Sequence, residues 1–75
     1  SAKNRHPDYD YEALLKKCDL SRIKNYQSSD SFQQNQAINH PKFGVGIVVE
    51  QREYNKISVC FQEGVRVLLQ APKET

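Results

Sequence analysis

Apolar positions follow different patterns in the two halves of the chain. From Gln36 onward the apolar residues are mostly β-branched, and every valine lies after Gly44. Before Gln36 they are mainly Leu, Tyr and Ala, separated by Gln, Ser and Asn. β-Branched side chains favour strands because they fit the pleated, half-buried surface of a sheet. The pattern predicts a helical or irregular arm over residues 1–35, a β-rich unit over residues 36–71 and a tail over residues 72–75.

The arm contains one segment with helical periodicity, DYDYEALLKKCDL, which predicts a helix over about residues 9–18. Asp8 or Asp10 can cap it by accepting amide hydrogens of the first turn. Its narrow apolar side consists of Tyr11, Leu14, Leu15 and Cys18. A helix this short is not stable alone in water, so it must pack on the β half or on a part of the protein outside this chain.

The segment that follows, NYQSSDSFQQNQ, has no period and is rich in Ser, Gln and Asn. Two interpretations are open. It is either a connecting loop pinned by Tyr26 and Phe32, or a solvated linker.

The β half divides into short strands separated by turn signals. QAINH, GVGIVVEQ, KISVCFQ and VRVLLQ are predicted strands, and Pro72 ends the last one. REYN is a predicted turn, with Asn55 suited to a left-handed conformation, and EG is a predicted two-residue hairpin turn. In KISVCFQ, Ile57, Val59 and Phe61 alternate with polar or small residues, so we expect them on the core face.

Short strands joined by tight turns in so few residues can curl into a small barrel, which removes most exposed sheet edges. We therefore expect a mainly β fold: a small SH3-like (Tudor-like) antiparallel barrel of four to five strands with a short N-terminal helix. Gly44 and Gly46 are expected to give the curvature that such a barrel needs. Pro41 ends the first strand, and Phe43 is expected to fill the barrel mouth.

No residue has the neighbours that catalysis requires. His40 lacks a local carboxylate or nucleophile, and beside Pro41 we expect it to cap the bend by hydrogen bonding to backbone. The G-x-G at Gly44 lacks the third glycine and the Lys-Ser/Thr pair of a phosphate-binding loop. Cys60 lies in mid-strand, where a cysteine is typically a small packed side chain. The sequence predicts no enzyme and no cofactor.

The two cysteines, Cys18 and Cys60, lie in segments of different character, which favours reduced thiols in a cytoplasmic protein. Together with His6 and His40 they lack the short spacings of a zinc site, so no metal is predicted. No apolar run approaches the roughly 18 residues of a membrane span, and no membrane partner is expected.

The net charge of +2 permits nucleic-acid binding without requiring it. The candidate partner-binding residues can gather on one rim of the barrel; they are Lys42, Arg52, Lys56, Arg66 and Tyr54. The alternative is a solvated surface in which Glu50, Glu53 and Glu63 are interspersed. An aromatic cage for a methylated cation from Phe43, Tyr54 and Phe61 is disfavoured because Phe61 is expected in the core.

The stretch INHPKFGVGIV, followed by KISVCFQEGVRVLL, resembles small barrels of bacterial transcription and repair proteins. These are the C-terminal domain of UvrD/PcrA-type helicases and, more distantly, the RNA-polymerase-interacting modules of CarD and the transcription-repair coupling factor. A closer resemblance is to uncharacterised bacterial proteins with an HPKFGxGxV motif, to which Tyr26, Phe32 and Gln36 extend the match. The matching motif positions are Ile38, His40, Pro41, Phe43, Gly44, Gly46, Val48, Val59, Phe61, Gly64, Arg66 and Leu68.

The resemblance implies a non-catalytic interaction module, expected to be a monomer, that binds a protein partner such as RNA polymerase. Two alternatives remain from the sequence: direct binding of nucleic acid, and a purely structural appendage whose helix docks on a larger protein. Most motif residues are those that build the barrel, so they specify the fold more than the function.

Overall fold

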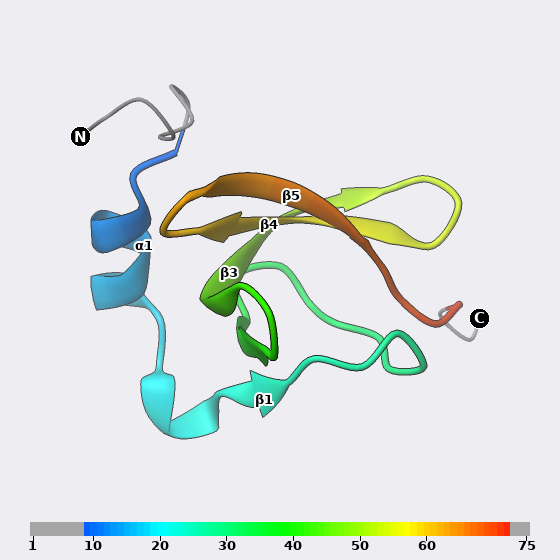
Figure 1. Cartoon of the computed structure of the whole chain (residues 1–75), viewed down its shortest axis with the longest axis horizontal. Coiled ribbons are helices and arrows are strands. Elements are labelled where there is room, and N and C mark those ends of the chain that lie inside the picture. Colours follow the sequence, from blue (N-terminus) through cyan, green and yellow to red (C-terminus); the bar gives the residue numbers. More distant parts are fainter. Residues whose placement is uncertain (1–8, 73–75) are drawn as a thin grey trace.

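A computed structural model of the chain describes residues 9–72, which form one helix and a curled sheet of five strands (Figure 1). The helix α1 spans Tyr11–Lys17, and a 3₁₀ turn spans Leu20–Arg22. The strands are β1 (Lys24–Asn25), β2 (Ala37–His40), β3 (Gly44–Arg52), β4 (Lys56–Phe61) and β5 (Gly64–Leu69). The prediction of a mainly β fold with a short N-terminal helix is confirmed. Asp8 and residues 73–75 of the predicted tail lie outside the described residues.

The strands are arranged in the order β1-β2-β3-β4-β5. Consecutive strands from β2 to β5 pair antiparallel, whereas β1 pairs parallel with β2 through Lys24–Ile38 and Asn25–Asn39. The sequence did not predict β1, because two polar residues have no strand periodicity. The sheet is therefore mixed, where an antiparallel one was expected.

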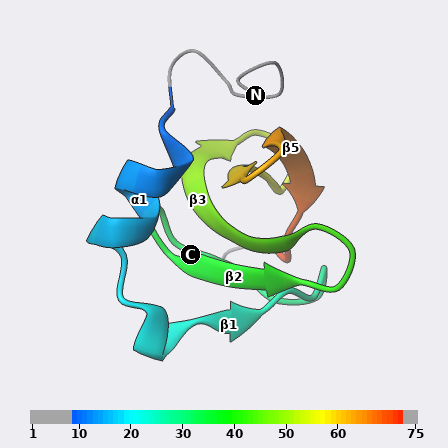
Figure 2. The same ribbon diagram turned by 60° about the vertical axis from the view of Figure 1, so that its left-hand side comes forward.

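The sheet curls but does not close, which corrects the expectation of a closed barrel (Figure 2). Its two edges are β1 and β5, and in the described residues no strand ladder joins them. Single hydrogen bonds cross this seam instead: Tyr26 Oη donates to the Leu69 carbonyl (2.7 Å), and Ala71 N donates to the Asp30 carbonyl (2.8 Å). The polar, Ser-rich chain after β1 lacks the β-branched residues that would extend β1 alongside β5. An SH3-like barrel is compatible with this open arrangement.

Residues from both halves of the chain share one core. Its buried side chains are Phe32, Ile38, Val48, Ile57, Val59 and Phe61, with Tyr26, Phe43 and Leu68 packed against them. Phe32 is fully buried although it comes from the loop between β1 and β2. The loop is thus pinned through Tyr26 and Phe32, and the arm and the β half form a single packed unit.

The helix packs on the barrel of its own chain. Asp10 caps it by accepting from Glu12 N (3.1 Å) and Ala13 N (3.3 Å). Tyr11 Oη donates to the Val45 carbonyl in β3 (3.0 Å). Of the two packing alternatives left by the sequence, the helix uses the β half. On the strand face opposite the core, Cys60 is also buried.

Gly44 and Gly46 meet two different needs. Gly44 has φ +82, in the left-handed region, with open space where a Cβ would lie. At Gly46 a Cβ would lie 2.6 Å from the Phe61 ring and 2.6 Å from a Val59 methyl. One glycine therefore allows the turn into β3, and the other allows β3 to approach β4 closely.

The turns agree with the sequence at one hairpin and differ at the other. Asn55 has the expected left-handed φ (59°), and Tyr54 shares that region (63°). In the β4–β5 hairpin, Phe61 pairs with Gly64, so the two turn residues are Gln62 and Glu63. The predicted EG turn is wrong by one residue, because Gly64 is the first residue of β5, with φ 144.

Candidate interaction surface

Aromatic side chains stack in a row along the open seam, and we call this row the seam stack. Its rings are, in order, Phe32, Tyr26, His40 and Phe43. The Arg66 guanidinium lies over the last ring. The ring centroids are 5.7 Å apart for Phe32–Tyr26, 4.9 Å for Tyr26–His40 and 4.6 Å for His40–Phe43. Arg66 Cζ lies 4.2 Å from the Phe43 centroid. Each inner ring has a neighbour of the stack on both sides, which leaves little ring face for a nucleobase to stack on.

His40 caps the bend between β2 and β3, which is the backbone contact expected from the sequence. Its Nδ1 accepts from Lys42 N (3.0 Å) and Phe43 N (3.3 Å). Burial, and then the charge of Lys42, lower the pKa of His40 below its ordinary value. The neutral ring is therefore held as an acceptor, and its Nδ1 is already used by the backbone.

The four candidate cations lie in two separate pairs, which corrects the expectation of one rim. Lys42 and Arg66 both lie over the Phe43 ring, with Lys42 Nζ 5.8 Å from its centroid. Arg52 and Lys56 face each other at the far end of the β3–β4 hairpin. The nine residues of β3 separate Lys42 from Arg52 along the chain, and Arg66 lies three residues before Leu69, the register partner of Lys56.

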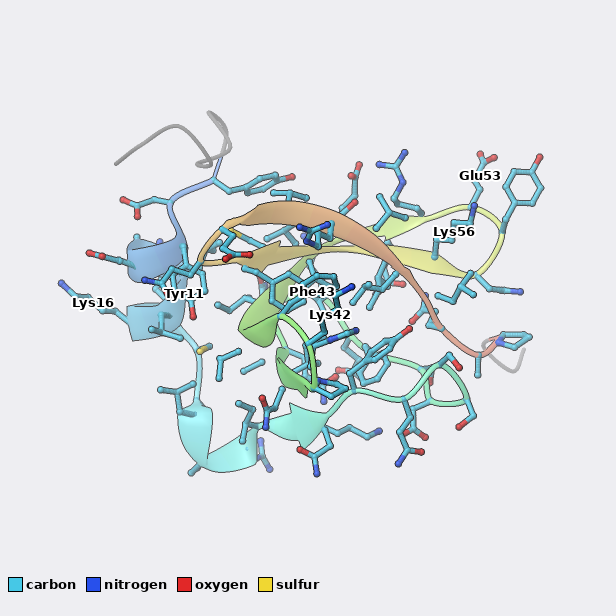
Figure 3. All side chains as sticks on the ribbon, viewed as in Figure 1. Tyr11, Lys16, Lys42, Phe43, Glu53 and Lys56 are labelled. Carbon is cyan, nitrogen blue, oxygen red and sulfur yellow. The ribbon has the colours of Figure 1, made fainter. Side chains whose placement is uncertain are left out.

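The hairpin pair is partly neutralised. Arg52 Nη1 lies 3.2 Å from Glu50 Oε1. Tyr54 at the tip is 83 % exposed, and Glu53 stands beside it (Figure 3). The tip thus carries carboxylates as well as cations, as the alternative of a mixed, solvated surface requires.

An aromatic cage is not assembled from the three predicted residues. Phe43 and Phe61 are neighbours, with centroids 5.4 Å apart, but Phe61 is buried. Tyr54 lies in the turn between β3 and β4, next to Glu53 in the chain, and Figure 3 shows Glu53 away from Phe43. The position over Phe43 that a methylated cation would take is occupied by Arg66 of the chain itself.

The edge of β5 offers backbone groups that the sheet does not use. Gln70 N donates to the Asn55 carbonyl on the β4 side, whereas the Leu69 carbonyl accepts from Tyr26 on the opposite side. Because these directions alternate along a strand, the amides and carbonyls of Val65 and Val67 face away from β4. The side chains of Val67 and Leu69 are also half exposed, at 50 % and 53 %.

Sequence reasoning did not single out Val65, Val67 or Leu69, because an edge strand and a central strand have the same local pattern. The sequence did contain a signal for this edge. VRVLL is the last strand of the predicted sheet, and the last strand is an edge whenever the barrel stays open.

The described residues offer little other chemistry. Within residues 9–72, no three His, Cys, Asp or Glu side chains gather as metal ligands. Cys18 and Cys60 are free, and burial raises the pKa of the Cys60 thiol, which disfavours its reactive thiolate. In the same range, none of the helical structure has the length and apolar character to cross a bilayer.

Comparison of the chain with protein-family models, with curated proteins and with solved structures gave no match.

Proposed function

We propose that this chain is a non-catalytic interaction module that binds a protein partner by adding an extended segment of that partner to the edge of β5. The observation that carries the proposal is the outward-facing backbone of Val65 and Val67 on an open sheet edge. Strand addition uses such groups for affinity and the flanking side chains for specificity. The resemblance to polymerase-binding barrels supports bacterial RNA polymerase as the first partner to test.

Two features of the β5 edge favour binding of a specific partner over pairing with arbitrary strands. Tyr26 already occupies the Leu69 carbonyl, so only the stretch around Val65 and Val67 is open. Arg66 stands between these two valines, and a charge on an edge strand opposes pairing with arbitrary hydrophobic strands.

The alternatives from the sequence have less support. The helix that a structural appendage would dock on a larger protein is packed on β3. For nucleic-acid binding, the cations are divided into one pair at the Phe43 ring and one pair at the β3–β4 hairpin, and the rings of the seam stack cover each other.

The test is the binding of purified bacterial RNA polymerase to the immobilised chain, measured by biolayer interferometry. Val67→Pro removes the outward amide and leaves the β4–β5 ladder intact, so we expect it to abolish binding. Val67→Thr keeps the amide and the branched shape, and we expect it to bind like the natural chain. Equal binding by Val67→Pro would refute strand addition, and no binding by the natural chain would refute the polymerase as partner.

A further inference from the structure

At the open edge of the sheet, the Arg66 guanidinium has no anionic partner among the residues that the structure describes. Among residues 9–72, the ion pairs are Lys24–Asp30 and Arg52–Glu50. Arg66 is exposed, and its side chain makes no hydrogen bond within this range. The guanidinium lies over the Phe43 ring, with Cζ 4.2 Å from the ring centroid.

This contact restrains the cation without using its hydrogen-bond donors. A guanidinium lying over a ring keeps its five N–H groups in its own plane, and that planar fork matches a carboxylate in a bidentate arrangement. Because Phe43 is held by the bend that His40 caps, the position of Arg66 is set by the core of the domain.

A second positive charge stands beside the first. Lys42 Nζ lies 5.8 Å from the centroid of the same Phe43 ring, and Lys42 is exposed. The nearest carboxylate along β5 is Glu63 in the β4–β5 turn, and it forms no ion pair with either cation. Two cations at one ring, neither of them ion-paired within residues 9–72, favour a negatively charged ligand group.

The register decides where that group lies on a partner. Arg66 is flanked by Val65 and Val67, whose backbone groups face outward. In a strand added beside β5, the residue opposite Arg66 projects on the same face as the Arg66 side chain. The residues opposite Val65 and Val67 project on the other face, beside the half-exposed Val67 side chain.

We propose that the β5 edge selects an extended segment in which Asp or Glu, paired with Arg66 and Lys42, stands between two apolar residues. This inference rests on the proposed function and adds the chemistry of the partner. Lys42 and Arg66 thus become specificity residues, whereas Arg52 and Lys56 at the distant hairpin do not take part.

The probe is a phage-displayed library of random heptapeptides, selected against the full chain and its variants. We expect the natural chain to enrich peptides with an acidic residue between two apolar ones. Arg66→Glu is expected to enrich Lys or Arg at the same place, and Val67→Pro to enrich no peptide. A synthetic enriched peptide should bind Arg66→Gln about tenfold more weakly than the natural chain, because a charged hydrogen-bonded pair is lost.

Two variants separate this effect from a loss of folding. Arg66→Lys keeps the charge and loses the planar fork, so its affinity should fall between those of the natural chain and Arg66→Gln. Arg52→Gln removes a cation already paired with Glu50 and should bind the peptide unchanged. Thermal melting of each variant checks that the domain stays folded.

The failures of the two proposals differ. Peptides that Val67→Pro binds as well as the natural chain, or a library that yields none, would overturn the proposed function together with this inference. Two results would overturn this inference alone. In the first, peptides that no longer bind Val67→Pro show no enrichment of acidic residues. In the second, such peptides bind Arg66→Gln as well as they bind the natural chain. If Arg66→Gln weakens binding of a dT₁₂ oligonucleotide while no acidic peptide is enriched, the ligand is phosphate and the acidic-peptide inference is wrong.

Discussion

Gln70 Nε2 donates a 2.8 Å hydrogen bond to Gln51 Oε1, and these two side chains hold the backbone of Phe32 between them. Phe32 N donates to Gln70 Oε1 (3.0 Å), and Gln51 Nε2 donates to the Phe32 carbonyl (2.8 Å). The ring of three hydrogen bonds joins β3, the loop before β2 and the chain after β5. It satisfies the polar backbone of a loop residue whose side chain lies in the core.

Replacing either Gln51 or Gln70 by leucine, a side chain of similar size, should lower the free energy of unfolding. Gln70→Leu leaves Phe32 N–H without a partner in a buried place, at a cost of about 1–3 kcal/mol. Gln51→Leu leaves the Phe32 carbonyl unpaired in the same way. Urea denaturation measures both, and the double variant should lose less than the sum because the three bonds form one ring. Gln62→Leu, in the exposed β4–β5 turn, is the matched control and should leave the midpoint unchanged.

The ring also marks the limit of what local patterns reveal. The strands β2 to β5 and the helix follow from periodicity and capping residues, and the bend at His40 follows from its place beside Pro41. Nothing in the pattern around Gln51 indicates that it meets a residue 19 positions away in the chain. The open seam was missed for the same reason, since closure depends on whether β1 is long enough to reach β5.

Of the candidate site, the sequence supplied Lys42 and Arg66 but grouped them with Arg52 and Lys56. Their true grouping is set by Phe43, whose ring both cations share. The backbone edge at Val65 and Val67 has no side-chain signature, so only the strand order reveals it.

The two glycines of the β2–β3 bend should respond differently to alanine. At Gly46 the new methyl meets Phe61 and Val59 at 2.6 Å, so Gly46→Ala should cost about 1–3 kcal/mol by overpacking. A simultaneous Phe61→Leu should recover part of this loss, because it relieves the contact with the ring and leaves the one with Val59. At Gly44 there is space for the methyl but φ is +82, so Gly44→Ala should cost about 1–2 kcal/mol of backbone strain.

Gly44→Asn distinguishes the two causes, because Asn tolerates the left-handed region better than Ala. It should therefore be milder than Gly44→Ala in urea denaturation. Recovery of Gly44→Ala by Phe61→Leu would contradict the strain explanation.

Stability should fall as the solution is acidified past the ordinary pKa of histidine. Burial, with a smaller effect of Lys42, lowers the pKa of His40 below 6.5. The unfolded chain therefore takes up a proton at a higher pH than the folded chain, and acid favours unfolding. The contribution of His40 to folding stability is complete above pH 6.5. It is lost as the pH falls through the lowered pKa of His40 in the folded chain.

Urea midpoints between pH 7.5 and about 5 measure this loss above the range where carboxylates titrate. His40→Asn is the control, because its side-chain oxygen can accept from the same backbone amides without titrating. A decline of equal size in His40→Asn would show that another group is responsible.

The hydroxyl of Tyr26 should contribute to holding the seam together. Tyr26→Phe keeps the ring between Phe32 and His40 and removes only the 2.7 Å bond to the Leu69 carbonyl. We expect a loss of about 1 kcal/mol of stability. We also expect faster amide exchange at Gln70, because the end of β5 beside it is no longer held to Tyr26. Tyr54→Phe, at the exposed hairpin tip, should change neither, and protection at Gln70 that survives Tyr26→Phe would contradict the role of the hydroxyl.

Cys60 should report on the docking of α1. Its thiol is buried beside Ile47 of β3, the strand to which Tyr11 of the helix is hydrogen-bonded. Burial raises the pKa of both the Cys60 thiol and the Tyr11 phenol, which keeps the thiol protonated and the phenol a donor. In a Cys18→Ser background, Tyr11→Phe should speed labelling of Cys60 by a disulfide reagent about fivefold, as expected for the loss of one hydrogen bond from the docked state. An unchanged labelling rate in Tyr11→Phe, at equal global stability, would show that Cys60 is reached by a route other than undocking of the helix.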